Sequence, residues 1–180
     1  MNGYKLKKLY IENFKLITSR TIDFDSFDLL ILDGPNGYGK TTIYDALELL
    51  ISQRISRIDD NDVEDNRNAH QDSLFAKNKQ KPILIKGEFV NEYQNNLVLA
   101  IFLPAKENSK IWSNYKCYLL NNYDDSIGQG IPQDNFDDVF GLSMNKIVLA
   151  DDFKNFYYIQ QENNTHFFKQ SEKDRVKLLS

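Results

Sequence analysis

The stretch LLILDGPNGYGKTTIYDALELL, residues 29–50, decides the fold. It opens with four apolar residues, 29–32, which predict a strand buried on both faces of a sheet. Residues 34–41, GPNGYGKT, fit the pattern G-x-x-x-x-G-K-[ST] at every fixed position. Apolar residues then follow at helical spacing: Ile43, Ala46, Leu47 and Leu50. A glycine-rich loop between a strand and a helix is the setting of a phosphate-binding loop, and an ordinary turn has no need of these flanks.

This loop has the chemistry that a triphosphate requires. Glycines let the main chain approach the phosphates without a Cβ clash, so that several backbone N–H groups point inward. The helix that follows presents its N-terminal N–H groups and the positive end of its dipole. We expect Lys40 to reach the β- and γ-phosphates, the Thr41 hydroxyl to bind Mg²⁺, and Thr42 to contact the α-phosphate. The predicted nucleotide-binding residues of this stretch are Gly34, Pro35, Asn36, Gly37, Tyr38, Gly39, Lys40, Thr41 and Thr42.

Composition and charge narrow the class of protein. The 180 residues with 41% hydrophobic content are enough for one sizeable core. No apolar run approaches the ~20 residues of a membrane span, so we expect no membrane association. The single cysteine, Cys117, rules out an internal disulfide and suits the reducing cytoplasm. The net charge of −4 argues against broad affinity for nucleic acid, although a local basic face stays open.

Two short strands are predicted before the P-loop. Residues 5–14, KLKKLYIENF, alternate between apolar and polar side chains, and residues 21–24, TIDF, form the second candidate. With the P-loop run, these segments make the chain resemble the N-terminal part of the ATPase heads of the SMC/RecF/RecN/SbcC superfamily. The form GPNGYGKTT is similar to that of SMC-like ATPases in anti-phage systems such as Lamassu. The resemblance implies an ABC-type P-loop NTPase of the α/β class, ATP, Mg²⁺ and work on DNA.

The match to this family has two departures and one further site residue. Tyr38 stands where serine is usual, but that position supplies backbone, and the pair of threonines at 41 and 42 keeps the hydroxyl that the site needs. Lys15 follows Asn13 and Phe14 and matches a basic position that faces the nucleotide phosphates in relatives. A solvated lysine on a loop is the alternative for Lys15.

The pattern of polar and apolar residues changes twice in the middle of the chain. Residues 52–81 are polar and irregular, which predicts a surface loop. Its basic residues could contact DNA or form a merely solvated cluster: His70, Lys77, Lys79 and Lys81. From residue 82 apolar residues recur at every second position, and strands are predicted at 83–90, 97–103 and 112–120. An antiparallel meander at this place is the β-lobe of ABC-type heads, whereas simple P-loop kinases continue with alternating strands and helices.

The segment after residue 147 leaves two readings of the catalytic site. Four apolar residues followed by Asp151 and Asp152 form the pattern of a Walker B strand, whose acids bind Mg²⁺ and orient water. This would suit a self-contained P-loop kinase or NTPase, although the N-K-x-D motif of GTPases is absent from the sequence. The resemblance instead implies a Q-loop in FYYIQQEN, residues 156–163. There Gln161, with Gln160 in reserve, would meet Mg²⁺ or the attacking water.

The resemblance also implies an incomplete head. We expect residues 4–52 to form the P-loop core, 82–120 the β-lobe and 147–180 the Q-loop segment. The coiled coil, signature motif, zinc hook and C-terminal half of such heads do not occur in residues 1–180. Relatives hydrolyse ATP between two heads, so a second head, the C-terminal half, DNA and accessory subunits are the expected partners. Alone, the chain should be nearly inactive. A nucleotide-gated interaction module that never hydrolyses ATP is the non-enzymatic alternative.

Overall fold

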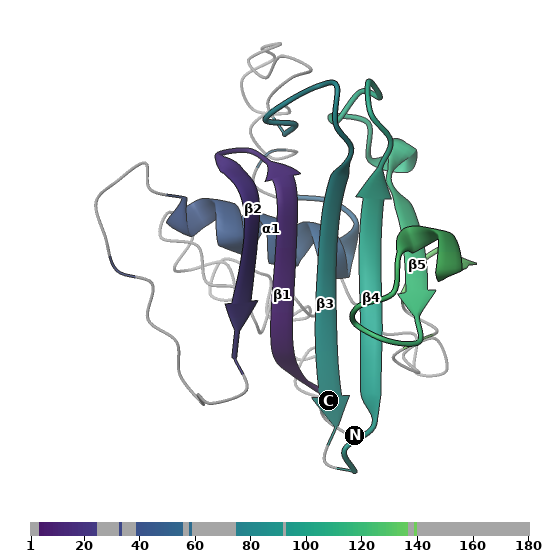
Figure 1. The fold of residues 1–180 in the computed structure, drawn as a ribbon. Coiled ribbons are helices and arrows are strands. Elements are labelled where there is room, and N and C mark those ends of the chain that lie inside the picture. The colour runs from purple at the N-terminus through teal and green to yellow at the C-terminus, as the bar shows by residue number, and fades with distance from the viewer. Residues whose placement is uncertain are drawn as a thin grey trace, which may run out of the picture. The chain divides into compact units, whose positions relative to one another are not determined.

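The computed structural model describes residues 4–24, 33, 39–55, 58, 75–91, 93–136 and 139. The chain divides into two compact units, Met1–Phe136 and Asp137–Ser180. All the regular elements described belong to the first unit (Figure 1). They are β1 Tyr4–Phe14, β2 Ile17–Asp23, α1 Lys40–Ser52, β3 Ile83–Asn91, β4 Asn96–Leu103, the 3₁₀ turn η1 Trp112–Asn114, β5 Lys116–Leu120, the 3₁₀ turn η2 Ile127–Gln129 and β6 Ile131–Gln133.

One antiparallel sheet organises this unit. Its strand order is β2-β1-β3-β4-β5-β6, so every neighbouring pair except β1 and β3 is also consecutive among the strands of the chain. The pairing of β1 with β3 brings Ile11 opposite Ile85 and Glu12 opposite Leu84. The strands expected ahead of the P-loop therefore lie in the same sheet as the strands expected in the β-lobe.

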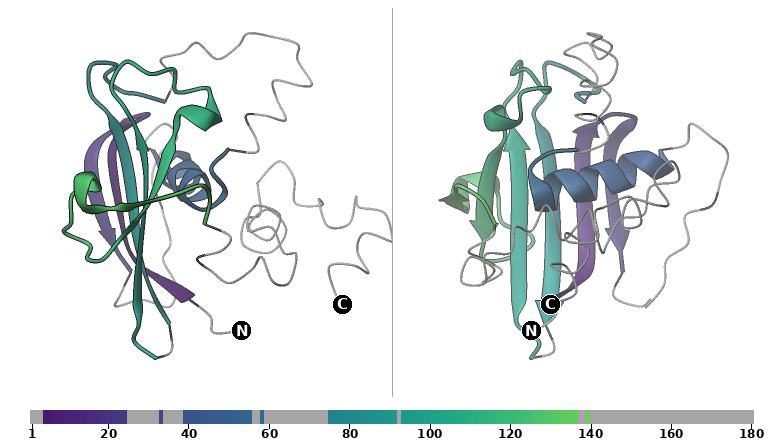
Figure 2. Two further views of the ribbon diagram at one scale, coloured as in Figure 1. Left: turned by 90° about the vertical axis from the view of Figure 1, so that its right-hand side faces the viewer. Right: turned by 180° about the vertical axis from the view of Figure 1, so that it is seen from behind.

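Helix α1 packs on one face of this sheet, against β1, β3 and β4 (Figure 2). Its buried apolar residues are Ile43, Ala46, Leu49 and Leu50, and the fully buried side chains of the strands include Leu9, Ile11, Ile85, Leu99 and Ile101. The helix approaches β3 at Gly87, where an added Cβ would lie 2.7 Å from Leu50 Cδ2 and 2.9 Å from Phe89 Cε2. A glycine in the middle of a strand serves here for close contact with the helix.

The other face of the sheet is covered in part by the connection between β5 and β6 (Figure 2). A small core forms there around Val98, Ala100 and Leu120, with four half-buried residues packed on it: Leu84, Tyr118, Tyr123 and Ile127. The Lys86 ammonium reaches under this connection and donates to the backbone oxygens of Tyr123 and Asp125. Burial lowers the pKa of Lys86 from its ordinary value.

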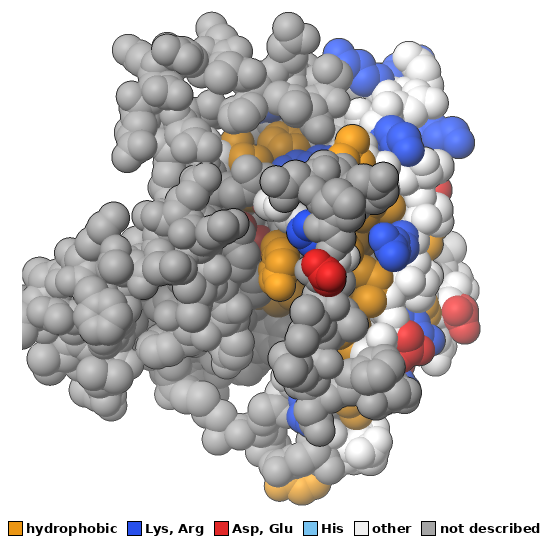
Figure 3. Space-filling model, turned by 90° about the vertical axis from the view of Figure 1, so that its left-hand side faces the viewer, with side chains coloured by type: hydrophobic (Ala, Val, Ile, Leu, Met, Phe, Trp, Pro, Cys, Tyr) orange, Lys and Arg blue, Asp and Glu red, His pale blue; other side chains and the backbone are white. Residues whose placement is uncertain are grey.

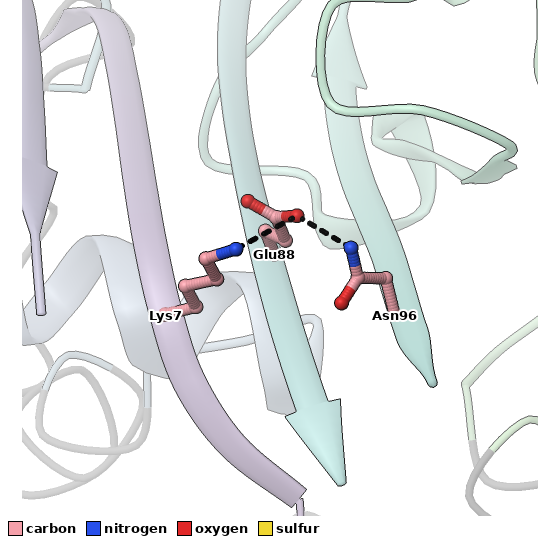
Figure 4. Close-up of polar contacts among 3 residues, drawn as sticks. All are labelled: Lys7, Glu88 and Asn96. Atoms are coloured by element: carbon pink, nitrogen blue, oxygen red, sulfur yellow. Dashed lines mark hydrogen bonds and ion pairs between the residues drawn. The ribbon is translucent and has the colours of Figure 1, made fainter. Parts of the chain in front are cut away.

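A buried carboxylate on the same strand shows how polar groups are satisfied on this face. Glu88 is 7% exposed, and its Oε1 accepts from Asn96 Nδ2 at 3.0 Å and lies 4.0 Å from Lys7 Nζ (Figure 4). The register between β1 and β3 shifts between Leu6 and Lys8, which marks a β-bulge at Lys7. The bulge and the neighbouring strand β4 thus bring two partners to one buried carboxylate.

Several expectations from the sequence need correction. The strand predicted over 112–120 is a 3₁₀ turn at Trp112–Asn114 followed by β5, which begins only at Lys116. Strand β6 lies outside the segments in which strands were predicted, and Pro132 is tolerated because β6 is an edge strand. The loop predicted over 52–81 is not all surface, since Ile55, Ile58 and Phe75 are buried.

Two further findings concern the limits of the described structure. The predicted strand 29–32 and the expected Q-loop segment 147–180 lie outside the described residues, as do Asp151 and Asp152. Within the part of the chain that is described, no helix combines the length and the apolar character needed to cross a membrane.

Candidate nucleotide-binding site

The site begins where helix α1 begins. Gly39 is the N-cap residue and has a left-handed backbone, with φ 88° and ψ 11°, a conformation that favours glycine. No side chain caps this end, and the first helical hydrogen bond runs from Ile43 N to Gly39 O at 3.2 Å. The N–H groups of residues 40–42 therefore have no acceptor within the helix. The first turn contains no acidic residue. Its donors and its dipole are thus suited to an anion.

The side chains of the first turn differ in exposure. Lys40 is half-buried, Thr41 is exposed and Thr42 is buried against the core. Hydroxyl and phosphate oxygens are the ligands that Mg²⁺ prefers, and the exposed Thr41 hydroxyl fits such a donor set. No group of three His, Cys, Asp or Glu side chains that could hold a metal occurs among the described residues. Predicted site residues 34–38 and Gln161 lie outside those residues.

Lys15 is joined to α1 through a buried ion pair. Its Nζ lies 2.5 Å from Asp45 Oδ2, with 15% of the Lys15 side chain and 1% of the Asp45 side chain exposed. Asp45 is on the same face of α1 as Thr41, four residues earlier, and its Cα is displaced by ~7.5 Å along the axis from that of Lys40. The structure therefore ties Lys15, a predicted site residue, to the first two turns of the P-loop helix. Its contact with phosphates stays a prediction.

Aromatic rings surround the Lys15 ammonium. Its Nζ lies 5.6 Å from the centroid of the Phe14 ring and 5.1 Å from that of the Phe75 ring. These two rings stack at 6.2 Å with an interplanar angle of 15°, and Phe75 also contacts Trp112 at 5.6 Å. Ring faces attract a cation, most strongly where water is excluded. The ammonium is thus paired with a carboxylate and lies near two aromatic rings.

Asn13 fixes the backbone that carries Lys15. It is 4% exposed, and its Nδ2 donates to the backbone oxygens of Asn78, Lys81 and Pro82 at 2.9, 2.9 and 3.0 Å. Its Oδ1 accepts from Asn78 N at 2.8 Å. Backbone bonds from Lys15 N to Phe75 O and from Lys77 N to Asn13 O add to this link. Asn13 and Lys15 both have positive φ, 54° and 50°, so the turn itself is an unusual one.

Reasoning from the sequence missed both Asp45 and Asn13. Asp45 had a visible signal, because it lies within the apolar stripe of the helix, between Thr42 and Leu49, where a charge needs a partner. Asn13 had no comparable signal, since its partners lie 65 to 69 residues further along the chain. A buried amide at a hairpin turn is visible only once the sheet is assembled.

Comparison with known proteins identifies the family of this chain. The family model described as "AAA domain" matches residues 8–180. No curated protein matches the chain. Among solved structures, it is similar to one titled "Structure of the recombination mediator protein RecF-ATP in RecFOR pathway", with 14% identity and a TM-score of 0.44. That match covers 69% of this chain and 29% of the RecF chain. Because the family model covers nearly the whole sequence, the chain belongs to the AAA domain family.

Proposed function

We propose that this chain is the ATP-binding and ATP-hydrolysing head segment of an SMC-like machine that acts on DNA, in repair, chromosome maintenance or anti-phage defence. One observation carries the proposal. The GPNGYGKT sequence leads directly into a helix whose first-turn N–H groups have no side-chain cap. Such a turn needs an external acceptor, and the sequence in front of it is that of a phosphate-binding loop.

Each site residue has a role in this proposal. The backbone N–H groups of the loop 34–39, apart from Pro35, would surround the phosphates. Lys40 would meet the β- and γ-phosphates, and Thr42 the α-phosphate. Thr41, with Gln161, would hold Mg²⁺, which neutralises the charge on the phosphates when it is bound. Lys15 would contact the phosphates from the hairpin turn, and its ion pair with Asp45 supports a fixed position for the ammonium while offsetting part of its charge.

The remaining parts of the proposal concern the whole protein. The P-loop core, β-lobe and Q-loop segment would form the N-terminal half of a head, completed by a C-terminal half and by a second head that meets it across ATP. Hydrolysis would then need both heads, so that the isolated chain turns over ATP hardly at all. The buried thiol of Cys117 supports a reducing compartment such as the cytoplasm.

The test is the substitution Lys40→Ala, measured as the affinity for a fluorescent ATP analogue. We expect binding to fall by at least a hundredfold, because the charge that meets the β- and γ-phosphates is removed. Lys116→Ala is the matched control, because Lys116 is an exposed lysine on β5 and should leave the affinity unchanged. Equal affinity of Lys40→Ala and the control for the ATP analogue would contradict the assignment of this loop as the nucleotide-binding site.

A second measurement separates the proposed head from a self-contained enzyme that uses Asp151 or Asp152. The isolated chain should hydrolyse ATP far more slowly than an ordinary enzyme, for which ~1 s⁻¹ is the lower end of typical turnover. Turnover at that rate or above would show a site complete in one chain. Slowing by Asp151→Asn, with Gln161→Ala unaffected, would then identify the Walker B acid.

A further inference from the structure

Helix α1 carries a buried carboxylate close to the end that would bind phosphates. Asp45 lies five residues after Lys40 on the same helix, and 1% of its side chain is exposed. Residues of one helix keep a fixed separation, so this carboxylate has a fixed position relative to the start of α1. Its negative charge repels the phosphates that the start of the helix is suited to bind. A carboxylate at this place therefore calls for an explanation.

The partner of Asp45 is an unusual lysine. Figure 3 shows lysine and arginine side chains that project from the surface of the described part of the chain, as is common for these residues. Lys15 differs from them, because only 15% of its side chain is exposed. The stem of a lysine is flexible, and ring faces attract an ammonium without fixing it at one point. The hydrogen bond of 2.5 Å from Lys15 Nζ to Asp45 Oδ2 therefore selects where the ammonium lies.

The backbone of Lys15 is held by other contacts. Asn13 and Lys15 have φ values of 54° and 50°, a left-handed conformation that is uncommon for residues other than glycine. Such residues keep this conformation only where their surroundings hold them, and they occur most often at functional sites. Here the Asn13 amide is bonded to residues 78–82, and Lys15 N donates to Phe75 O at 2.7 Å. Both ends of the Lys15 side chain are thus fixed, the ammonium end by Asp45.

Packing alone does not account for a charged pair at this place. An ion pair is costly to bury, and apolar residues of similar volume are often at least as stable. The rings of Phe14 and Phe75 already surround the Lys15 side chain, and a methionine would pack against them without a charge. What the pair supplies, and an apolar pair would lack, is a positive charge at a fixed place beside α1.

We propose that Asp45 is a positioning residue of the nucleotide site, which holds the Lys15 ammonium where it contacts the phosphates of ATP. The inference rests on the proposed function, in which Lys15 is a phosphate contact, and it adds a residue that touches no phosphate itself. Its consequence is opposite in sign to the effect of charge alone. Removal of a nearby carboxylate would strengthen ATP binding by reducing repulsion, whereas loss of the Lys15 position weakens it.

The experiment titrates the full chain with a fluorescent ATP analogue, and circular dichroism checks that each variant is folded under the same conditions. We expect Asp45→Asn to weaken binding about tenfold, the size of effect that loss of one charge-assisted hydrogen bond has. The double variant Lys15→Met/Asp45→Asn should have the same low affinity as Asp45→Asn, although it should be the more stable of the two because it buries no charge.

The control Gly87→Ala separates affinity from stability. Its added Cβ meets Leu50, ten residues after Lys40, so it should destabilise the packing of α1 and keep the wild-type affinity. An equal loss of affinity in Gly87→Ala would overturn the inference, because any loosening of α1 would then have the same effect.

Three further results would overturn the positioning role. Unchanged or tighter binding by Asp45→Asn would show that the carboxylate acts by its charge alone. Recovery of both affinity and stability in the double variant would show that Asp45 serves only the structure. A much larger loss in the double variant would show that Lys15 acts without Asp45. Lys40→Ala tests the proposed function separately. If it binds the analogue as well as the wild type does, or if the wild type does not bind, the nucleotide site itself is wrong.

Discussion

Asp45 is a buried carboxylate in the middle of the apolar face of α1, and Lys15 is its partner from a hairpin turn. Burying the two charges is costly, and their mutual attraction at 2.5 Å, together with the two aromatic rings near the ammonium, offsets that cost. The net contribution of the pair to the free energy of folding is therefore small. A buried charge without its partner would be strongly unfavourable, so the pair favours the one arrangement in which the two residues meet. The ion pair thus fixes the position of the hairpin turn relative to helix α1.

The substitution Asp45→Asn tests this dependence. It keeps the shape of the side chain but leaves the Lys15 ammonium without its carboxylate, so we expect the free energy of unfolding in urea to fall by about 2–3 kcal/mol. Asp134→Asn is the matched control, because Asp134 is exposed and its substitution should change stability by less than about 0.5 kcal/mol. The double variant Lys15→Met/Asp45→Asn should recover part of the loss, and strict additivity of the two single effects would argue against the pair.

At the scale of elements, the packing of α1 on the sheet depends on Gly87. The Cβ of an alanine there would meet Leu50 and Phe89 at distances that these buried side chains cannot relieve without moving. We expect Gly87→Ala to lower the free energy of unfolding by about 1–3 kcal/mol. The control is Gly128→Ala, whose Cβ would have only Ser126 Oγ at 4.0 Å as a neighbour. Leu50→Val should restore part of the stability that Gly87→Ala loses. If it does not, the contact with Leu50 is not the cause of the loss.

The elements themselves were largely predictable from the sequence. The P-loop NTPase fold is confirmed by the family match. The spacing of apolar residues alone was enough to predict α1, β3 and β4. The same periodicity does not distinguish a strand from a 3₁₀ turn in the short stretch at Trp112–Asn114, nor does it reveal β6, which has only three residues. The role of Asn13 could not be predicted, because it depends on contacts between segments far apart in sequence. The assignments of Lys40, Thr41 and Gln161 stay predictions.

For the molecule as a whole, the buried Cys117 and Tyr115 and the half-buried Tyr123 predict sensitivity to alkali. Burial raises the pKa of Cys117 to about 11 and that of Tyr123 to about 12, and it raises the pKa of Tyr115 as well. The unfolded chain loses these protons at the lower, ordinary pKa values. Stability is therefore fully present below pH 9 and falls as the pH rises from there towards 12, since the unfolded state binds fewer protons.

Urea unfolding at a series of pH values from 8 to 12 measures this loss. Tyr123→Phe should have a shallower decline between pH 10 and 12, because one of the groups that titrate there has been removed. Tyr93→Phe is the control, because Tyr93 is 66% exposed and should leave the decline unchanged. Parallel curves for Tyr123→Phe and the wild type would contradict the buried phenol as a cause.

The strand order has a consequence for how the chain reaches this structure. Four of the five strand pairings join consecutive strands, and each can form as a local hairpin or meander. The pairing of β1 with β3 alone must close a long loop, which includes helix α1 and costs chain entropy before any contact is made. The β1–β2 hairpin and the meander from β3 to β6 would thus form separately and quickly, and their joining would limit the folding rate. During synthesis, β1 would wait with one edge unpaired until residue 91 had left the ribosome.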